Sequence, residues 1–229
     1  MKILAIDTAT EACSAALLID GEITHEFQLA PREHTQLILP MVDRLLSSAQ
    51  LKIKNLDALS FARGPGAFTG VRIAAGIIQG LSYVDDIPVV PVSTLAAIAA
   101  GVYASSGHKN ILSAIDARMG EVYWGVYKAD DGLIELVGNE IVSTVELLPE
   151  IESSEWTGAG TGWSEYKEQL MKKYSVKAEN ILDEYLPSAK DIVRLAANDF
   201  KLGKAISAHQ AQPVYLRDNV AKKKAALIK

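Results

Sequence analysis

Four short segments of the sequence carry residue types that are able to take part in chemistry. The first is Asp7-Thr8-Ala9-Thr10, which directly follows an apolar run. An aspartate in such a turn can position a metal-bound phosphate when the neighbouring backbone approaches the ligand closely. Ala9 places a Cβ where a glycine would permit that approach. The residue types therefore favour a second interpretation, in which Asp7 accepts hydrogen bonds from the amides of its own turn.

The second segment is a glycine-rich loop, Gly64–Arg72, with the sequence GPGAFTGVR. It precedes an expected helix, and free amides at a helix N-terminus beside three glycines suit a bound anion. No lysine follows Gly70, so the loop is not a Walker A motif and lacks a point charge for a transferring phosphoryl group. Arg72 replaces that charge only weakly, because an arginine early in a helix more often forms a surface ion pair. Taken alone, the loop is a weak signal for phosphate binding.

Metal ligands and a hydrolase nucleophile are not evident. Zinc ligands on a helix need a spacing of four residues, but the residue four beyond His34 is Ile38. The other histidines stand alone and far apart in the sequence (His25, His108 and His209). No Gly-x-Ser-x-Gly elbow supports a serine hydrolase.

Two more segments carry charge. In Asp116–Trp124, with the sequence DARMGEVYW, an Asp–Arg pair can bridge a hairpin, and the alternating aromatic residues are typical of a packed strand. The C-terminal tail is basic, with only Asp218 opposing Arg217, Lys222, Lys223, Lys224 and Lys229. Such a tail is able to contact an RNA backbone, although a solvated tail is the commoner case.

The composition is that of a globular protein. Among 229 residues, 49% are hydrophobic and 22% are charged, which allows one large domain or two smaller ones. The net charge of −5 argues against an extended nucleic-acid surface. Cys13, the only cysteine, lies in an apolar run and excludes an internal disulfide. The most apolar stretch, 89–104, is too short to span a bilayer, and no targeting segment is evident. We therefore expect a cytoplasmic protein without a membrane span.

An internal similarity indicates a duplication. The N-terminal ILAIDTATEACSAALLIDGEI is echoed by ILSAIDARMGEVYWGVYKADDGLI, with Asp7 aligned to Asp116. In both copies an apolar run ends in Ile-Asp, and a turn, a second strand and an Asp/Gly turn follow. One such match can arise by chance, but the agreement of successive elements favours a real duplication.

Hydrophobic periodicity predicts the elements of each half. We expect strands at 2–7, 12–20, 22–29, 56–61, 88–92, 110–116, 121–128 and 133–142. We expect helices at 34–49, 70–84, 93–105, 144–151, 163–173 and 188–203. This order predicts an α/β fold of two duplicated lobes, each a mixed sheet covered by helices. The expected lobes are 1–105 and 106–229, with the last residues able to pack back on the first lobe. The arrangement is that of the actin, sugar-kinase and heat-shock ATPase superfamily, an analogy of fold alone.

Six segments together resemble the TsaB (YeaZ) family, a group related to the TsaD transferase. They occur in the family's order and span nearly the whole chain: ILAIDTAT, EHTQLILP, GPGAFTGVRIAAG, VPVSTLAAIA, IDARMGEVYWG and PVYLRD. The resemblance implies an actin-like, ribonuclease H-like fold and a role in forming N6-threonylcarbamoyladenosine at the tRNA adenosine beside the anticodon. In TsaD a helical His-x-x-x-His pair holds the catalytic metal. Thr94 and Ile98 stand at the matching positions here.

The resemblance therefore implies a scaffold subunit without a catalytic residue, metal ligand or cofactor of its own. It implies that the chain binds and activates TsaD, pairs with itself when TsaD is absent, and works with the ATPase TsaE and a TsaC-type enzyme. Contact with tRNA would arise through the complex, and a nucleotide at the subunit interface stays open. Two other classes remain as alternatives: an active ATPase or small-molecule kinase of the actin-like fold, and a glycoprotease-like metallopeptidase.

A partner surface is expected on the helices at 34–49 and 70–84. The first has more apolar positions than one core-facing stripe needs. The second contains Gly76-x-x-x-Gly80, which lets another backbone approach closely. Packing within the chain is the competing explanation for both. The residues expected at the interface are Leu37, Ile38, Met41, Leu45, Ile73, Gly76, Ile77 and Gly80.

Overall fold

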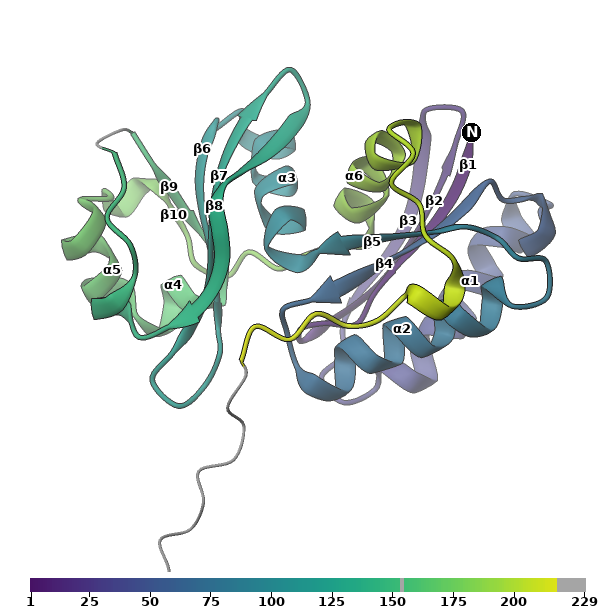
Figure 1. Cartoon of the computed structure of the whole chain (residues 1–229), viewed down its shortest axis with the longest axis horizontal. Coiled ribbons are helices and arrows are strands. Elements are labelled where there is room, and N and C mark those ends of the chain that lie inside the picture. Colours follow the sequence, from purple (N-terminus) through teal and green to yellow (C-terminus); the bar gives the residue numbers. More distant parts are fainter. Residues whose placement is uncertain (153–154, 218–229) are drawn as a thin grey trace, which may run out of the picture.

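The computed structural model describes residues 1–152 and 155–217 and contains two five-stranded sheets side by side (Figure 1). The strand order of the first sheet is β3-β2-β1-β4-β5. Strands β1, β2 and β3 form an antiparallel meander, and β4 and β5 continue the sheet in parallel to β1. The strand bounds are β1 Lys2–Asp7, β2 Ala12–Ile19, β3 Glu22–Leu29, β4 Ala58–Gly64 and β5 Val89–Ser93.

The second sheet repeats this plan. Its order is β10-β9-β6-β7-β8, again with an antiparallel meander followed by two parallel strands. Here β6 is Asn110–Asp116, β7 Val122–Asp130, β8 Leu133–Ser143, β9 Thr157–Ala159 and β10 Ile181–Leu182. The first strand of each sheet occupies the centre, and Asp7 and Asp116 end these two strands. The predicted fold class, two duplicated α/β lobes of the actin-like kind, is confirmed.

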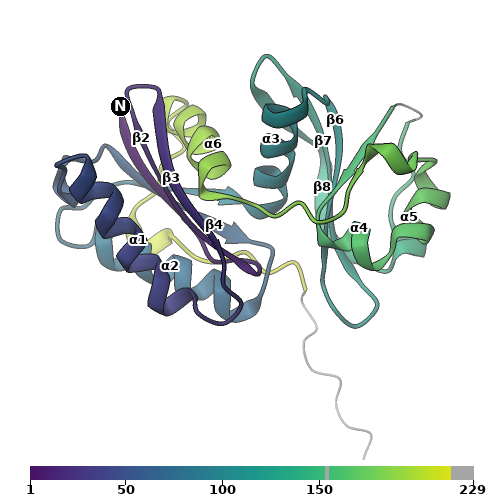
Figure 2. The same ribbon diagram turned by 180° about the vertical axis from the view of Figure 1, so that it is seen from behind.

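Helices cover both faces of each sheet, which explains why β1 and β2 are buried almost throughout. Helices α1 (His34–Ser48) and α2 (Phe68–Ser82) pack on one face of the first sheet, and α6 (Ala189–Lys201) packs on the other. On the second sheet, α3 (Thr94–Ser106) covers one face, while α4 (Thr161–Glu165) and α5 (Lys167–Tyr174) lie against the other. Figure 2 shows α3 and α6 facing each other between the sheets.

Helices α3 and α6 each pack on the sheet of the other lobe, if the chain is divided into lobes at residue 105. Leu95, Ile98 and Val102 of α3 lie in the core of the second sheet, although this helix precedes that sheet in sequence. In return, Ile192 and Val193 of α6 lie in the core of the first sheet. The lobes are therefore interleaved, because each contributes one helix to the space between them.

Several predicted elements differ from the structure. In place of a helix at 144–151 there is a single 3₁₀ turn, Val145–Leu147, because Pro149 drives the preceding Leu148 into an extended conformation. The helix expected at 163–173 is divided into α4 and α5, with Tyr166 outside helical geometry. Strands β9 and β10 were missed because three and two residues are too few for a periodic pattern.

A segment near the C-terminus runs back along the first lobe (Figure 1, yellow). Ile206 forms a β-bridge with Val89, and a 3₁₀ turn, Ala208–Gln210, follows beside α2. We call residues 211–217 the C-terminal strap. Hydrogen bonds hold it to the first lobe: Gln79 Nε2 donates to the Ala211 carbonyl at 3.0 Å, the Val214 amide donates to the Arg63 carbonyl at 2.8 Å, and Arg72 Nε donates to the Tyr215 hydroxyl.

Candidate functional site

Asp7 and Asp116 occupy equivalent turns at the ends of β1 and β6. Asp7 Oδ1 accepts a hydrogen bond from the Ala9 amide at 2.8 Å, and Asp116 Oδ1 accepts one from the Arg118 amide at 2.8 Å. Burial raises the pKa of Asp7 to about 6, and its Oδ2 has no partner among the described residues. Both aspartates thus cap their own turns, as the second interpretation of Asp7 predicted.

The glycine-rich loop Gly64–Arg72 is filled by the chain's own backbone. A Cβ on Gly66 would lie 2.4 Å from the Ala9 carbonyl oxygen, and one on Gly70 would lie 2.0 Å from that of Thr8. The Ala67 amide donates to the Ala9 carbonyl at 2.8 Å. Thr8 Oγ1 donates to the Gly70 carbonyl at 2.7 Å. These glycines therefore allow the loop to press against the Asp7 turn, and part of the expected anion cradle is already occupied.

A cleft of about 740 Å³ lies between the lobes beside this loop. Its walls come from the Asp7 and Asp116 turns, the start of α2, α4 and the C-terminal strap. The lining residues include Ala9, Glu11, Phe68, Arg72, Asp116, Arg118, Tyr123, Thr161, Ser164, Tyr215 and Arg217. The volume falls within the range of small-molecule sites.

Arg72 forms a stacked cluster with two aromatic residues in the cleft wall. Its Nε donates to the Tyr215 hydroxyl at 2.7 Å. Its guanidinium carbon lies 3.4 Å from the centre of the Phe68 ring and 5.4 Å from that of Tyr215. Sequence reasoning considered Arg72 as a weak phosphate partner or an ion-pair partner and missed this cluster. Tyr215 lies 143 residues from Arg72, so no local pattern indicated the contact.

The strap reaches the second lobe through Arg217. The Arg217 guanidinium donates to the Ala117 carbonyl at 3.0 Å and pairs with the Glu121 carboxylate. The receiving turn also holds an Arg118–Asp116 ion pair at 3.0 Å. The predicted Asp–Arg pair of this hairpin is therefore present. The lysines of the predicted basic tail, Lys222, Lys223, Lys224 and Lys229, lie outside the described residues.

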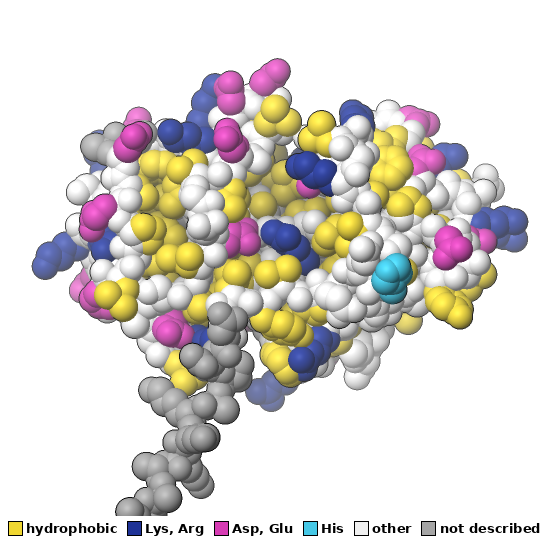
Figure 3. All heavy atoms as spheres, in the orientation of Figure 1, with side chains coloured by type: hydrophobic (Ala, Val, Ile, Leu, Met, Phe, Trp, Pro, Cys, Tyr) yellow, Lys and Arg dark blue, Asp and Glu magenta, His cyan; other side chains and the backbone are white. Residues whose placement is uncertain are grey.

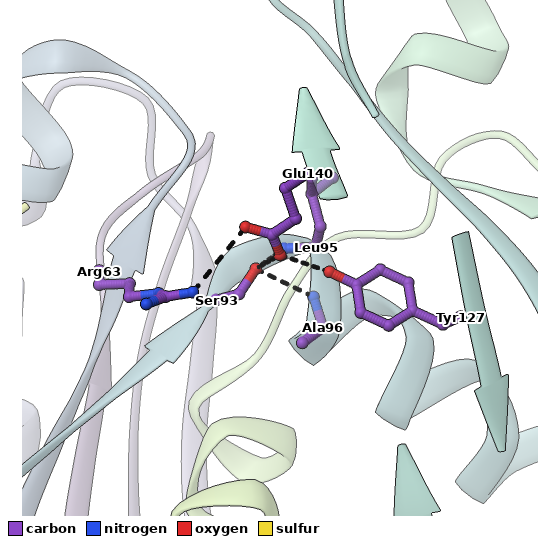
Figure 4. A network of polar contacts seen from close by, with 6 residues as sticks. All are labelled: Arg63, Ser93, Leu95, Ala96, Tyr127 and Glu140. Atoms are coloured by element: carbon purple, nitrogen blue, oxygen red, sulfur yellow. Dashed lines mark hydrogen bonds and ion pairs between the residues drawn. The ribbon is translucent and has the colours of Figure 1, made fainter. Parts of the chain in front are cut away.

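A second polar network joins the lobes around Glu140 of β8 (Figure 4). Ser93 Oγ and the Tyr127 hydroxyl both donate to Glu140 Oε1, and Arg63 Nη2 lies 4.0 Å from Oε2. Ser93 also caps α3 by accepting hydrogen bonds from two amides of its first turn. Burial, together with the Glu140 charge, raises the pKa of Tyr127 well above its ordinary value. Sequence reasoning missed this network because its members come from four separate elements.

Thr94 and Ile98, the residues that the sequence resemblance aligns with metal-binding histidines of TsaD, are both buried on α3. Ile98 packs in the core of the second sheet. Neither a threonine nor an isoleucine supplies the imidazole nitrogen that such a metal site needs. Among the described residues, no three His, Cys, Asp or Glu side chains gather in a way that suits a metal ion.

The prediction of a partner surface on α1 and α2 requires a correction at three positions. Ile38, Met41 and Leu45 are buried in the core beneath the first sheet and cannot contact a partner. Their spacing of three and four residues is that of the one helix stripe that faces the sheet. The other five expected residues are at least partly accessible: Leu37, Ile73 and Ile77 are half-buried, and Gly76 and Gly80 are exposed.

We call the accessible side of the two helices the α1–α2 face. It consists of Leu37 and Leu39 on α1 and of Ile73, Gly76, Ile77 and Gly80 on α2. Leu39 is exposed, and a Cβ on Gly76 or Gly80 would meet nothing within 4 Å. The glycines therefore leave a shallow, apolar strip on α2 that the described part of the chain does not fill.

Among the described residues, no helix is long and apolar enough to cross a membrane.

Comparison with known proteins identifies the family of this chain. Residues 27–225 match the family model described as TsaD, tRNA N6-adenosine threonylcarbamoyltransferase. The tRNA threonylcarbamoyladenosine biosynthesis protein TsaB of Escherichia coli is 45% identical over 98% of both chains. The structure of YeaZ from Pseudomonas aeruginosa superimposes with a TM-score of 0.86, at 44% identity over 94% of this chain and 99% of that one.

A second Pseudomonas aeruginosa structure, described as an uncharacterized protein similar to peptidase YeaZ, gives a TM-score of 0.88 at 43% identity, over 94% of this chain and 99% of that one. The near-complete coverage of these relatives agrees with the six motifs found in the sequence. The chain belongs to the TsaB (YeaZ) family, a branch of the wider family that includes the TsaD transferases.

Proposed function

We propose that this chain is a non-catalytic subunit required for forming N6-threonylcarbamoyladenosine in tRNA, and that it docks and activates a TsaD transferase through the α1–α2 face. The observation that carries the docking proposal is the open, glycine-containing strip of α2. Gly76 and Gly80 lie on the same side of the helix, and no other described part of the chain covers them. Two helices can approach closely across such small residues. In the absence of TsaD, the same strip would pair with a second copy.

The catalytic silence of the chain is supported by two features of its sites. The glycine-rich loop already packs closely against the backbone of the chain's own Thr8 and Ala9. It therefore offers a poor binding site for a triphosphate. Thr94 and Ile98 stand where the family resemblance aligns the two metal-binding histidines of the transferase. We therefore expect that the chain alone forms no modified tRNA from L-threonylcarbamoyl adenylate, and that TsaD, TsaE and a TsaC-type enzyme are needed for the full reaction.

The two enzymatic alternatives make different demands. An ATPase or kinase needs an open phosphate hairpin, and a metallopeptidase needs metal ligands that also place a water molecule. The residues at the corresponding positions favour neither. Turnover of ATP or of a peptide by the purified chain, lost when Asp7 is changed to alanine, would support one of them against the proposal.

The docking proposal is tested by the substitution Gly80→Arg. The position is exposed on α2 with open space around it, so the fold should tolerate arginine, which is also a better helix former than glycine. At an interface, however, the long side chain separates the two helices and introduces an unpaired charge, which costs several kcal/mol. We expect loss of co-elution with TsaD in size-exclusion chromatography and loss of modified tRNA, with an unchanged or higher melting temperature.

The matched control is Gln169→Arg, which adds the same charge at an exposed position of α5 in the second lobe. It should leave both the melting temperature and the complex unchanged. If Gly80→Arg keeps its partner, the interface lies elsewhere on the molecule. If the substitution lowers the melting temperature sharply, Gly80 serves packing within the chain, and the docking proposal loses its main support.

A further inference from the structure

The cluster of Phe68, Arg72 and Tyr215 presents an accessible aromatic surface to the cleft. Phe68 is 56% exposed and Tyr215 47% exposed, although both are large apolar rings. Their ring centres are 5.9 Å apart, and the planar Arg72 group lies against the Phe68 ring. Within the described part of the chain, Arg118 and Arg217 of the cleft are paired with carboxylates, whereas Arg72 makes no ion pair. The cleft thus combines two exposed rings with one arginine that has no ion-pair partner among the described residues.

This combination suits a single nucleotide unit. Bases stack on aromatic rings and on guanidinium planes, and one phosphate needs only one arginine. The cleft volume of about 740 Å³ is ample for one base and its sugar. A triphosphate is a poorer match, because the Gly66 and Gly70 loop is pressed against the Thr8–Ala9 backbone and the Ala67 amide is already used.

The proposed function, and not the charge of the cleft, favours a nucleotide that belongs to a longer strand. Glu11, Asp116 and Glu165 line the cleft together with Arg72, Arg118 and Arg217, so the charges of its walls are balanced. Elsewhere, acidic and basic side chains are interspersed on the face shown in Figure 3, so any contact with a polyanion must be local.

We propose that the cleft receives one unpaired nucleotide of the RNA substrate, with its base against the Phe68–Tyr215 rings and its phosphate facing Arg72. This inference rests on the proposed function for its choice of RNA, and it adds a direct substrate contact to a subunit otherwise assigned to docking. The contact is local, in keeping with a net charge of −5. The chain therefore helps TsaD to hold the tRNA and does not act only as a platform.

The test measures binding of a fluorescein-labelled anticodon stem-loop RNA with an unmodified adenosine, by anisotropy, to the complex of the full-length chain with TsaD. Phe68→Ala and Tyr215→Ala should each weaken binding about tenfold, because stacking contributes on that scale per base. Arg72→Gln should weaken binding and lower the salt dependence by about one phosphate contact. Phe27→Ala, which removes an exposed ring on β3, should change nothing.

Two further variants separate stacking from structure. Tyr215→Phe removes the hydroxyl that accepts from Arg72 but keeps the ring, so it should retain RNA affinity. Millimolar AMP or ATP should compete weakly with the RNA; low-micromolar competition by ATP would instead assign the cleft to a free nucleotide. Ultraviolet crosslinking should place the RNA on the strap or on the start of α2.

The proposal is overturned if the complex binds the RNA equally well with and without Phe68, Tyr215 and Arg72. That result leaves the proposed function intact as long as TsaD still co-elutes with these variants and modified tRNA still forms. Conversely, loss of TsaD binding in Gly80→Arg, with RNA crosslinking to the free chain retained, would separate the docking face from the cleft.

Discussion

The two lobes share one strand plan but differ in their outer helices. In the first lobe, α1 and α2 have 15 residues each and leave an apolar side open. In the second, the corresponding face carries α4 and α5, of five and eight residues. The aspartate turns differ in the same way: Asp7 is fully buried, whereas the side chain of Asp116 stays partly accessible and pairs with Arg118. The two lobes thus share their strand plan and differ in the layers that cover their sheets.

Substitutions of two glycines test whether both lobes need the same close packing against their central strands. In both lobes a glycine touches the central strand or its turn: a Cβ on Gly70 would lie 2.0 Å from the Thr8 oxygen, and one on Gly160 2.3 Å from the Ala114 oxygen. We expect Gly70→Ala and Gly160→Ala each to lower the free energy of unfolding by about 2–4 kcal/mol in urea denaturation. Gly76→Ala, on the open side of α2, should raise it by about 0.5–1 kcal/mol. A tolerated Gly70→Ala would mean that the loop is free to open for a ligand.

The buried aspartate should make the first lobe sensitive to pH. Burial raises the pKa of Asp7 from 3.8 to about 6, so the folded state holds this proton more tightly than the unfolded state does. Its stabilising contribution is therefore complete below about pH 4 and is lost as the pH rises through 6. Asp7→Asn keeps the acceptor for the Ala9 amide and removes the charge.

The stability of Asp7→Asn relative to the parent chain should therefore increase by up to about 3 kcal/mol between pH 4 and pH 8. Urea denaturation at several pH values measures this difference. The matched Asp116→Asn change in the second lobe loses an ion pair to an exposed arginine and should cost less than about 1 kcal/mol at pH 8. A pH-independent effect of Asp7→Asn would show that the carboxylate is better solvated than its burial indicates.

The smallest expected effect concerns the strap that joins the lobes. Arg217→Ala removes a charged hydrogen bond to the Ala117 carbonyl and an ion pair with Glu121, both partly accessible. We expect a loss of about 0.5–1 kcal/mol, with faster amide hydrogen exchange in residues 211–217 and in the turn at 117–121. Lys204→Ala, which breaks an exposed pair with Asp199, serves as the control. Unchanged exchange in both segments would mean that the Arg217 contacts do not help to hold the lobes together.

The sequence by itself determined the parts of this protein that depend on local order. Alternating apolar runs, capping residues and the repeated Ile-Asp turn predicted the long strands, the long helices and the duplication. The motifs GPGAFTGVR and DARMGEVYW predicted the family. These signals succeed because strand and helix periods, and the conformations that glycine and proline permit, are properties of short segments.

Only the tertiary structure decided which faces are free and which distant residues meet. Ile38, Met41 and Leu45 lie in the core of the first lobe, although their helix has apolar residues on more than one side. Helix α3 packs on the second sheet and α6 on the first. The Tyr215 hydroxyl accepts a hydrogen bond from Arg72, which is 143 residues away in the sequence. Such contacts follow from the packing of whole layers, in which the burial of one face decides the exposure of another, and no short segment of the chain contains that information.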